Sequence, residues 1–225
     1  MIFNDLKNEI DFFLRNKIKI SRKNYVEKNK KALEINIAQN KYFKEILEQY
    51  FFKIQNKELQ ILDIGSKNWF YVKGIWEFFS SFSSSFFIDG VELDAYRLYS
   101  NFYSRYEVAK YYSKDLKHAN YIAGNLLDIN KKYDYITWFL PFVTYNPHKY
   151  WGLPKRYFYP EKLLNHAYSL LNDNGQMLIV NQGEKERDVQ KAMLEKQNFN
   201  FEFLGEIKNN YYKFENKRYG FLIKK

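Results

Sequence analysis

The chain has 225 residues, of which 46% are apolar, enough for the core of one α/β domain. It contains no cysteine, which excludes disulfides and thiolate metal sites, and its three scattered histidines form no metal-binding pattern, so we expect no metal. A formal charge of +10 is compatible with a nucleic-acid partner, although heavy use of lysine, asparagine, isoleucine, phenylalanine and tyrosine favours compositional bias. No apolar stretch reaches the roughly 18 residues that span a membrane, and the charged N-terminus is not a secretory signal, so we expect a cytoplasmic protein.

The N-terminal part predicts two helices, over residues 1–20 and 24–54, from apolar residues at helical spacing. In the first helix these residues are Ile2, Leu6, Ile10, Phe13 and Leu14. Residues 15–31 carry eight Lys or Arg and one Glu, a run that is either a solvated basic face or a substrate-docking element. No Pro or Gly linker follows, so residues 1–57 are predicted to form a helical cap on a single unit over residues 58–225.

From residue 60 onward, short apolar runs alternate with helical patterns. The predicted strands cover residues 60–64, 86–93, 120–123, 133–140 and 176–180. The predicted helices cover residues 69–80, 94–113 with Asp94 as N-cap, 160–172 and 184–197. Two strand-like runs around "KNN" near the C-terminus predict an antiparallel hairpin. The fold class is therefore α/β, a doubly wound and mostly parallel sheet with an antiparallel edge hairpin.

Residues suited to binding a nucleoside-like ligand follow the first three predicted strands. In a doubly wound sheet such ligands bind outside the carboxyl ends of the strands. Gly65 permits a tight turn, and Glu92 can accept hydrogen bonds from the two hydroxyls of a ribose. Asn125 has a donor and an acceptor that suit an adenine edge, while Leu93 and Leu126 offer apolar faces to a base.

These motifs make residues 58–225 resemble the class I S-adenosylmethionine-dependent methyltransferases. The resemblance rests on "ILDIG", "GVELD", "IAGNLLD" and "YDYITWFLPF" in that order, followed by "LLNDNGQMLIV". It implies a seven-stranded sheet with one antiparallel strand and S-adenosylmethionine as the cofactor. It also implies cofactor contacts for Asp63, Gly65 and Ser66 at the methionine end, Glu92 at the ribose, Asn125 at the adenine, and Phe139, Leu140 and Pro141 at the wall facing the methyl group.

The sequence departs from the family pattern in two loops. Lys67 and Trp69 stand where the family usually continues with glycines, and Asn125 stands where it usually has an aspartate. Because the cofactor carries no phosphate, one glycine can suffice for the turn. Lys67 is predicted either to pair with the carboxylate of the cofactor or to face solvent, and Trp69 is predicted to pack against a helix.

The acceptor is predicted to bind the segment after the fourth strand, residues 138–160, an aromatic loop that holds all four prolines of the chain. The alternative is a rigid aromatic plug over the sheet edge. Phe139 occupies the place where methyltransferases of exocyclic base amines have an amine-accepting residue, which argues against adenine or cytosine as acceptor. His148, ahead of Tyr145, is the candidate for an acid, base or orienting group, although a surface histidine is an equal alternative. The other candidates are Asn146, Asn181 and Glu184.

Three hypotheses follow from the sequence. The first is a metal-independent methyltransferase acting on a small or medium, aromatic or apolar acceptor. The second is an RNA or protein methyltransferase that docks its substrate through the basic N-terminal cap. The third is a non-catalytic, cofactor-binding protein on the same fold. The methyl acceptor and the oligomeric state do not follow from the sequence.

Overall fold

The computed structural model describes residues 2–20, 25–54 and 58–225, and its centre is one seven-stranded sheet. The strands are β1 (Leu59–Ile64), β2 (Phe86–Glu92), β3 (Ala119–Ala123), β4 (Tyr133–Phe139), β5 (Leu171–Gln182), β6 (Phe201–Glu206) and β7 (Arg218–Lys224). Their spatial order is β3-β2-β1-β4-β5-β7-β6, and β7 runs antiparallel to both of its neighbours. The predicted doubly wound, mostly parallel sheet with an antiparallel edge hairpin is confirmed.

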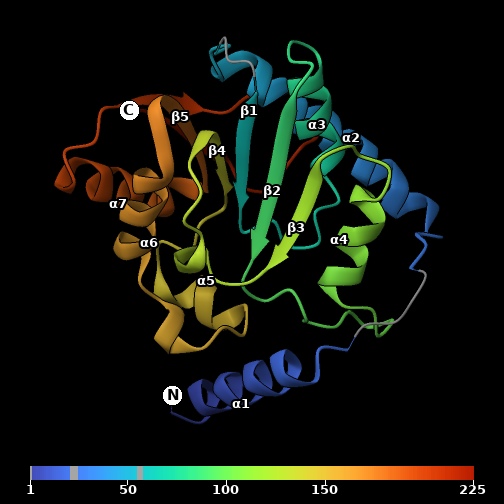
Figure 1. The fold of residues 1–225 in the computed structure, drawn as a ribbon. Coiled ribbons are helices and arrows are strands. Elements are labelled where there is room, and N and C mark those ends of the chain that lie inside the picture. The colour runs from blue at the N-terminus through green and yellow to red at the C-terminus, as the bar shows by residue number, and fades with distance from the viewer. Residues whose placement is uncertain (1, 21–24, 55–57) are drawn as a thin grey trace.

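Helices cover both faces of this sheet (Figure 1). They are α1 (Ile2–Ile18), α2 (Lys30–Tyr50), α3 (Val72–Ser80), α4 (Arg105–Ser113), α5 (Tyr145–Tyr150), α6 (Pro160–Leu170) and α7 (Gly183–Lys196). Two short 3₁₀ helices are η1 (Leu126–Asp128) and η2 (Lys155–Tyr157). Helices α2, α3 and α4 lie on one face and α6 and α7 on the other, while α1 lies across the carboxyl ends of the strands.

The alternating direction of strand side chains divides the core into two apolar clusters. Leu59 and Ile61 of β1 pack on the side of α2 and α3, and Leu62 and Ile64 pack on the side of α6 and α7. Helices α2 and α3 approach so closely that a Cβ on Gly74 would lie 2.2 Å from the backbone oxygen of Asn40. The Asn40 side chain also accepts the Gly74 N–H at 2.7 Å. The face carrying α2 is therefore fixed by close backbone packing as well as by apolar burial.

Two predicted elements are wrong in extent. The helix predicted over residues 94–113 begins only at Arg105, where Ser104 and Glu107 form a reciprocal capping box. Asp94 is therefore not an N-cap. The segment after β4, predicted as a loop, folds into α5 and η2, so it is a built part of the rim.

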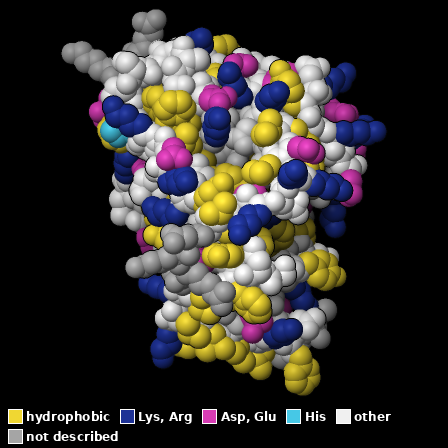
Figure 2. All heavy atoms as spheres, turned by 90° about the vertical axis from the view of Figure 1, so that its right-hand side faces the viewer, with side chains coloured by type: hydrophobic (Ala, Val, Ile, Leu, Met, Phe, Trp, Pro, Cys, Tyr) yellow, Lys and Arg dark blue, Asp and Glu magenta, His cyan; other side chains and the backbone are white. Residues whose placement is uncertain are grey.

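The apolar stripe of α1 faces outward. Figure 2 shows hydrophobic side chains gathered at the end of the molecule where α1 lies. The exposed members are Phe3, Leu6, Ile10, Phe13, Leu14 and Ile18, each at least 46% exposed. Among residues 3–18 of this helix, Phe12 is the one buried apolar residue. The helix therefore contacts the rest of the protein mainly through its polar face.

Candidate functional site

A cavity of about 650 Å³ opens at the carboxyl ends of β1, β2, β3 and β4. Gly65, Glu92 and Asn125, each from a different strand end, line it together with Phe139. Its volume lies within the range of roughly 300–1,000 Å³ that is usual for small-ligand sites. The predicted meeting of these loops at one edge of the sheet is therefore what the structure shows.

The turn after β1 is held against the neighbouring strand by its backbone. Gly65 has a φ of +71°, and the N–H groups of Gly65 and Ser66 both donate to the carbonyl oxygen of Val91, at 2.9 and 3.2 Å. A Cβ on Gly65 would meet no atom within 4 Å, so the constraint on this residue is its backbone conformation. The backbone of Gly65 therefore forms part of the cavity wall.

Asp63 lies beneath this turn and does not line the cavity. Its carboxylate accepts hydrogen bonds from Trp69 Nε1 at 2.9 Å, the Tyr71 hydroxyl at 2.8 Å and the Thr137 hydroxyl at 2.7 Å. Complete burial raises the pKa of Asp63 to about 7, against the lowering effect of these three hydrogen bonds. The structure gives Asp63 a supporting position. Ser66 is likewise fully buried and outside the cavity lining.

Trp69 is buried in the core, where it packs against strand β2, although a helix was predicted as its neighbour. Its indole lies so close to β2 that a Cβ on Gly90 would approach Trp69 Cε2 to 2.5 Å. The ring is fully buried. The absence of a side chain at Gly90 therefore makes room for the tryptophan.

Glu92 ends β2 and ties two loops together at the cavity. Its Oε2 accepts the Lys67 N–H at 2.9 Å, and its Oε1 accepts the Asp94 N–H at 2.8 Å. Oε1 also lies 3.5 Å from the guanidinium of Arg105. A carboxylate has about four acceptor positions, so three donors leave one for a ligand. Glu92 is 8% exposed and this exposed part lines the cavity.

Lys67 lines the cavity, while Arg105 is buried outside the lining and paired with Glu92 and Asp94. The Nζ atom of Lys67 and the guanidinium of Arg105 lie 5.2 and 5.1 Å from the ring centre of Trp151. Burial lowers the pKa of Lys67, the charge of Arg105 lowers it further, and Glu92 opposes both. A partly buried lysine in the cavity lining favours an anionic ligand group such as a carboxylate.

Asn125 lines the cavity, but its amide is partly engaged by the protein. Its oxygen accepts the Leu127 N–H at 3.1 Å, and its Nδ2 donates to the Tyr159 hydroxyl at 3.1 Å. One N–H and one acceptor position of the amide remain for a ligand. Leu93 and Leu126 lie on the same cavity wall.

The end of β4 forms an aromatic wall. Phe139, Leu140 and Pro141 all line the cavity, as predicted from their place after the strand. Phe43 of α2 meets the Phe139 ring edge-on at a centroid distance of 4.5 Å and stacks on Tyr71 at 4.1 Å. Helix α2 thus supplies part of the cavity wall.

The structure separates the two acid–base candidates. His148 is buried and lines the cavity, and its Nε2 lies 2.9 Å from the Pro154 carbonyl oxygen. Since a carbonyl only accepts, Nε2 carries the proton and Nδ1 is the remaining nitrogen; burial lowers the pKa of this ring. Tyr145 does not line the cavity, because its hydroxyl donates to Asp5 of α1 at 2.8 Å.

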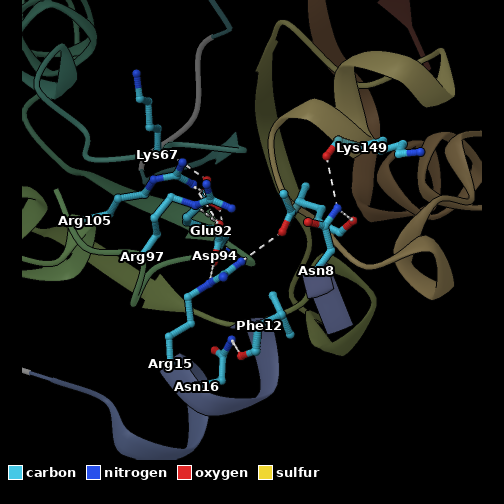
Figure 3. Close-up of polar contacts among 12 residues, drawn as sticks. Asn8, Phe12, Arg15, Asn16, Lys67, Glu92, Asp94, Arg97, Arg105 and Lys149 are labelled. Carbon is cyan, nitrogen blue, oxygen red and sulfur yellow. Dashed lines mark hydrogen bonds and ion pairs between the residues drawn. The ribbon is translucent and has the colours of Figure 1, made fainter. Parts of the chain in front are cut away.

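Polar contacts fasten α1 to both sides of the rim (Figure 3). Arg15 donates to the fully buried carboxylate of Asp94 at 2.6 Å, and Arg97 donates to its other oxygen at 2.6 Å. On the other side, Asn8 donates to the Lys149 carbonyl at 3.1 Å, and Arg15 donates to the Gly152 carbonyl at 3.1 Å. Helix α1 therefore bridges the loop after β2 and the segment around α5.

Several cavity residues were not predicted. They include Gln39 and Phe43 of α2, Gln182, and Glu186, Gln190 and Met193 of α7. Of these, the α7 residues carry a usable signal, because positions 186, 190 and 193 share one face of a helix. Glu184, the candidate chosen from the sequence, is exposed and bonds to Tyr219, and Asn181 is fully buried outside the lining. Asn146 also lies outside the lining.

Neither a metal centre nor a membrane span is found in the described part of the chain. No group of three or more His, Asp or Glu side chains among these residues is placed to hold a metal ion. No helix among them is long and apolar enough to cross a bilayer.

The fold matches known structures although the sequence matches none closely. No family model and no curated protein matches the chain. The carbon methyltransferase CurJ aligns with a TM-score of 0.59 and 11% identity over 82% of this chain, which spans 53% of that chain. A SAM dependent methyltransferase from Aquifex aeolicus aligns with a TM-score of 0.57 and 11% identity, over 88% of this chain and 99% of that one.

Magnesium protoporphyrin IX methyltransferase from Synechocystis PCC 6803, solved with bound SAH, aligns over almost the whole length of both proteins. The alignment has a TM-score of 0.54 and 11% identity, over 99% of this chain and 98% of that one. At such identities the likeness is one of fold. The chain therefore has the fold of the S-adenosylmethionine-dependent methyltransferases, and the predicted resemblance is confirmed at that level.

Proposed function

We propose that the chain is an S-adenosylmethionine-dependent methyltransferase that acts without a metal ion on a small or medium, aromatic or apolar acceptor. The observation that carries the proposal is the shared cavity at the carboxyl ends of β1 to β4. Structural neighbours solved with bound SAM or SAH support the choice of cofactor.

The cavity offers each part of this cofactor a suitable partner. The one remaining acceptor position of Glu92 suits a ribose hydroxyl, and the backbone at Gly65 and the cation of Lys67 suit the amino-acid end. Asn125 and the apolar faces of Leu93 and Leu126 suit the adenine. The wall of Phe139, Leu140 and Pro141 faces the reacting end and excludes water from it.

The bound cofactor supplies a methyl group on a positively charged sulfur. The acceptor attacks the methyl carbon in line, and the sulfur leaves. The protein mainly has to orient the acceptor and keep the site dry. His148, whose Nδ1 makes no hydrogen bond to the described residues, is retained as a candidate orienting group.

The N-terminal part has two roles in this proposal. Helix α2 contributes Gln39 and Phe43 to the cavity, and α1 acts as a cap over its rim. Residues 21–24 of the basic run lie outside the described residues, and Arg15 of the same run is paired with Asp94. Because the cavity is lined mainly by apolar and aromatic side chains, we prefer a small acceptor over RNA or protein. A cytoplasmic location, consistent with a cysteine-free chain, is also part of the proposal.

The test is calorimetric titration with S-adenosylhomocysteine of the natural protein and of Glu92→Gln. We expect micromolar binding, about −8 kcal/mol, weakened at least tenfold in the variant, or about 1.4 kcal/mol. The matched control is Glu77→Gln on the surface of α3, which should bind normally.

Thermal unfolding of both variants separates lost binding from lost structure. Equal affinity of Glu92→Gln and the natural protein would remove the ribose assignment. If the natural protein binds neither S-adenosylmethionine nor S-adenosylhomocysteine, the proposed function is wrong and the chain has the methyltransferase fold without its cofactor site.

A further inference from the structure

Helix α7 places a carboxylate and a carboxamide on the wall of the cavity. Glu186 and Gln190 are four residues apart, so they lie on the same face of the helix, and both line the cavity. The Oε2 atom of Glu186 accepts the Gln182 N–H at 3.1 Å. None of the described residues donates to the other oxygen, Oε1.

Gln190 is an unsatisfied amide in the protein interior. It is 1% exposed, and its Nε2 has no hydrogen-bond partner among the described residues. Leaving a buried donor unpaired costs about 1–3 kcal/mol, and native proteins rarely do so without a ligand or water nearby. The amide therefore indicates a polar group of a ligand on this side of the cavity.

The surroundings of these two groups are apolar and rich in rings. The neighbouring lining residues on β4, α6 and α7 and from the loop before β7 include Trp138, Phe139, Leu163, Leu164, Met193 and Phe214. Arg218 of β7 is the charged group that faces Glu186; its guanidinium lies 4.4 Å from the centre of the Phe214 ring and donates to Gln182 at 2.8 Å. Burial raises the pKa of Glu186, against the lowering effects of the Gln182 N–H and Arg218.

We propose that the α7 side of the cavity binds an acceptor with a phenolic hydroxyl, with Glu186 as its general base and Gln190 as a hydrogen-bond donor to it. The aromatic walls hold the ring, and the only polar groups needed are one proton acceptor and one donor. The assignment rests on the methyltransferase function proposed above.

The chemical step is balanced by these groups and the cofactor. The acceptor oxygen forms a bond to the methyl carbon while the carbon–sulfur bond breaks and its electron pair moves to sulfur. The hydroxyl proton moves to Oε1 of Glu186. Base assistance of this kind contributes about 10²- to 10⁴-fold in rate.

Other acceptor classes fit this wall less well. A carboxylate acceptor would be repelled by the charge of Glu186, and a phosphorylated one would lose its hydration against apolar rings. A neutral phenol has neither difficulty, because it brings an apolar ring and a proton to donate.

The probe for the test is 4-nitrophenol, whose neutral and ionised forms absorb at different wavelengths. Its binding and ionisation are followed by absorbance against pH, without cofactor. Because a nearby carboxylate disfavours the phenolate, we expect the pKa of the bound probe to exceed that of the free probe by about one unit or more. In Glu186→Gln this increase should largely disappear.

Two further variants provide the controls. Glu184→Gln alters the exposed neighbouring carboxylate on the same helix and should leave the increase intact. Gln190→Leu removes the amide at similar size and should weaken binding about threefold or more. With methyl-labelled cofactor, transfer to phenols should fall about 100-fold in Glu186→Gln.

The outcomes separate the two proposals. No binding of the probe at millimolar concentration, or an unchanged increase in Glu186→Gln, overturns the phenol subsite even if S-adenosylhomocysteine binds. Normal affinity for the probe in Gln190→Leu removes the role of the amide. The pKa of the bound probe can also rise in a Glu186-dependent way in a protein that binds no cofactor. That result supports the phenol subsite and contradicts the methyltransferase function. Transfer to amines with phenols untouched also overturns the acceptor class.

Discussion

The two N-terminal helices share an apolar sequence pattern but use it in opposite ways. Helix α2 buries Tyr42, Phe43, Ile46 and Leu47 against the sheet layer and α3. Helix α1 turns its apolar stripe to solvent and docks through polar side chains, chiefly Arg15 and Asn8, to the rim of the cavity. One helix is therefore part of the core, and the other is a polar cap over the site.

The difference shows that helical spacing predicts a helix but does not say what the helix packs against. Helix α2 has a shaped partner, because Gly74 of α3 leaves room for its backbone at Asn40. Helix α1 has a partner of another kind, a buried carboxylate at Asp94 that Arg15 helps to neutralise. Helix α2, which buries an apolar face, is therefore expected to be held more strongly to the rest of the protein than α1, which pairs with one buried charge.

The largest effect is expected from the core helix. Ile46→Ala removes a fully buried side chain of α2, so the free energy of unfolding should fall by about 2–5 kcal/mol. Urea unfolding followed by circular dichroism measures the change. The matched control is Ile37→Ala on the same helix, where the side chain is 58% exposed and the loss should be below about 1 kcal/mol. Equal losses at both positions would contradict the core assignment of α2.

A smaller and local effect is expected from the cap. Arg15→Ala removes one hydrogen bond to Asp94 and one to Gly152, while Arg97 remains on the Asp94 carboxylate. The charge-assisted contact is worth about 1.5–3 kcal/mol, so α1 should open more often without global unfolding. Hydrogen exchange of the α1 amides should accelerate about tenfold or more, whereas Lys17→Ala, on the exposed side of α1, should leave it unchanged. Unchanged exchange in Arg15→Ala would show that α1 is held by something else.

The sequence predicts the sheet and the strand-end loops because both follow from local rules. Apolar runs ended by Gly65, Glu92 and Asn125 identify strands whose ends must meet at one edge. The sequence does not reveal which side chains at that edge face the cavity. Asp63 lies in β1 and Ser66 lies in the turn that follows, yet both side chains are fully buried outside the cavity lining.

The contributions of α2, α5 and α7 to the site depend on tertiary packing. Phe43 lines the cavity because α2 packs beside the end of β4. Tyr145 lies outside the lining because its hydroxyl donates to Asp5 of α1. Glu186 rather than Glu184 faces the cavity because of the way α7 packs against β5 and β7. Such facts require the positions of distant segments, which periodicity within one segment does not contain.

The smallest effect on stability is expected from the exposed stripe of α1. Leu6→Ser changes a side chain that is 55% exposed, so the free energy of unfolding should change by less than about 0.5 kcal/mol. The chemically similar Leu47→Ser on α2 places a hydroxyl in the core at a fully buried position and should cost several kcal/mol, about 3 or more. Urea unfolding of the two variants at the same protein concentration measures both. A loss above about 1 kcal/mol in Leu6→Ser would mean that the stripe is covered in solution, and the contrast between the two helices would then vanish.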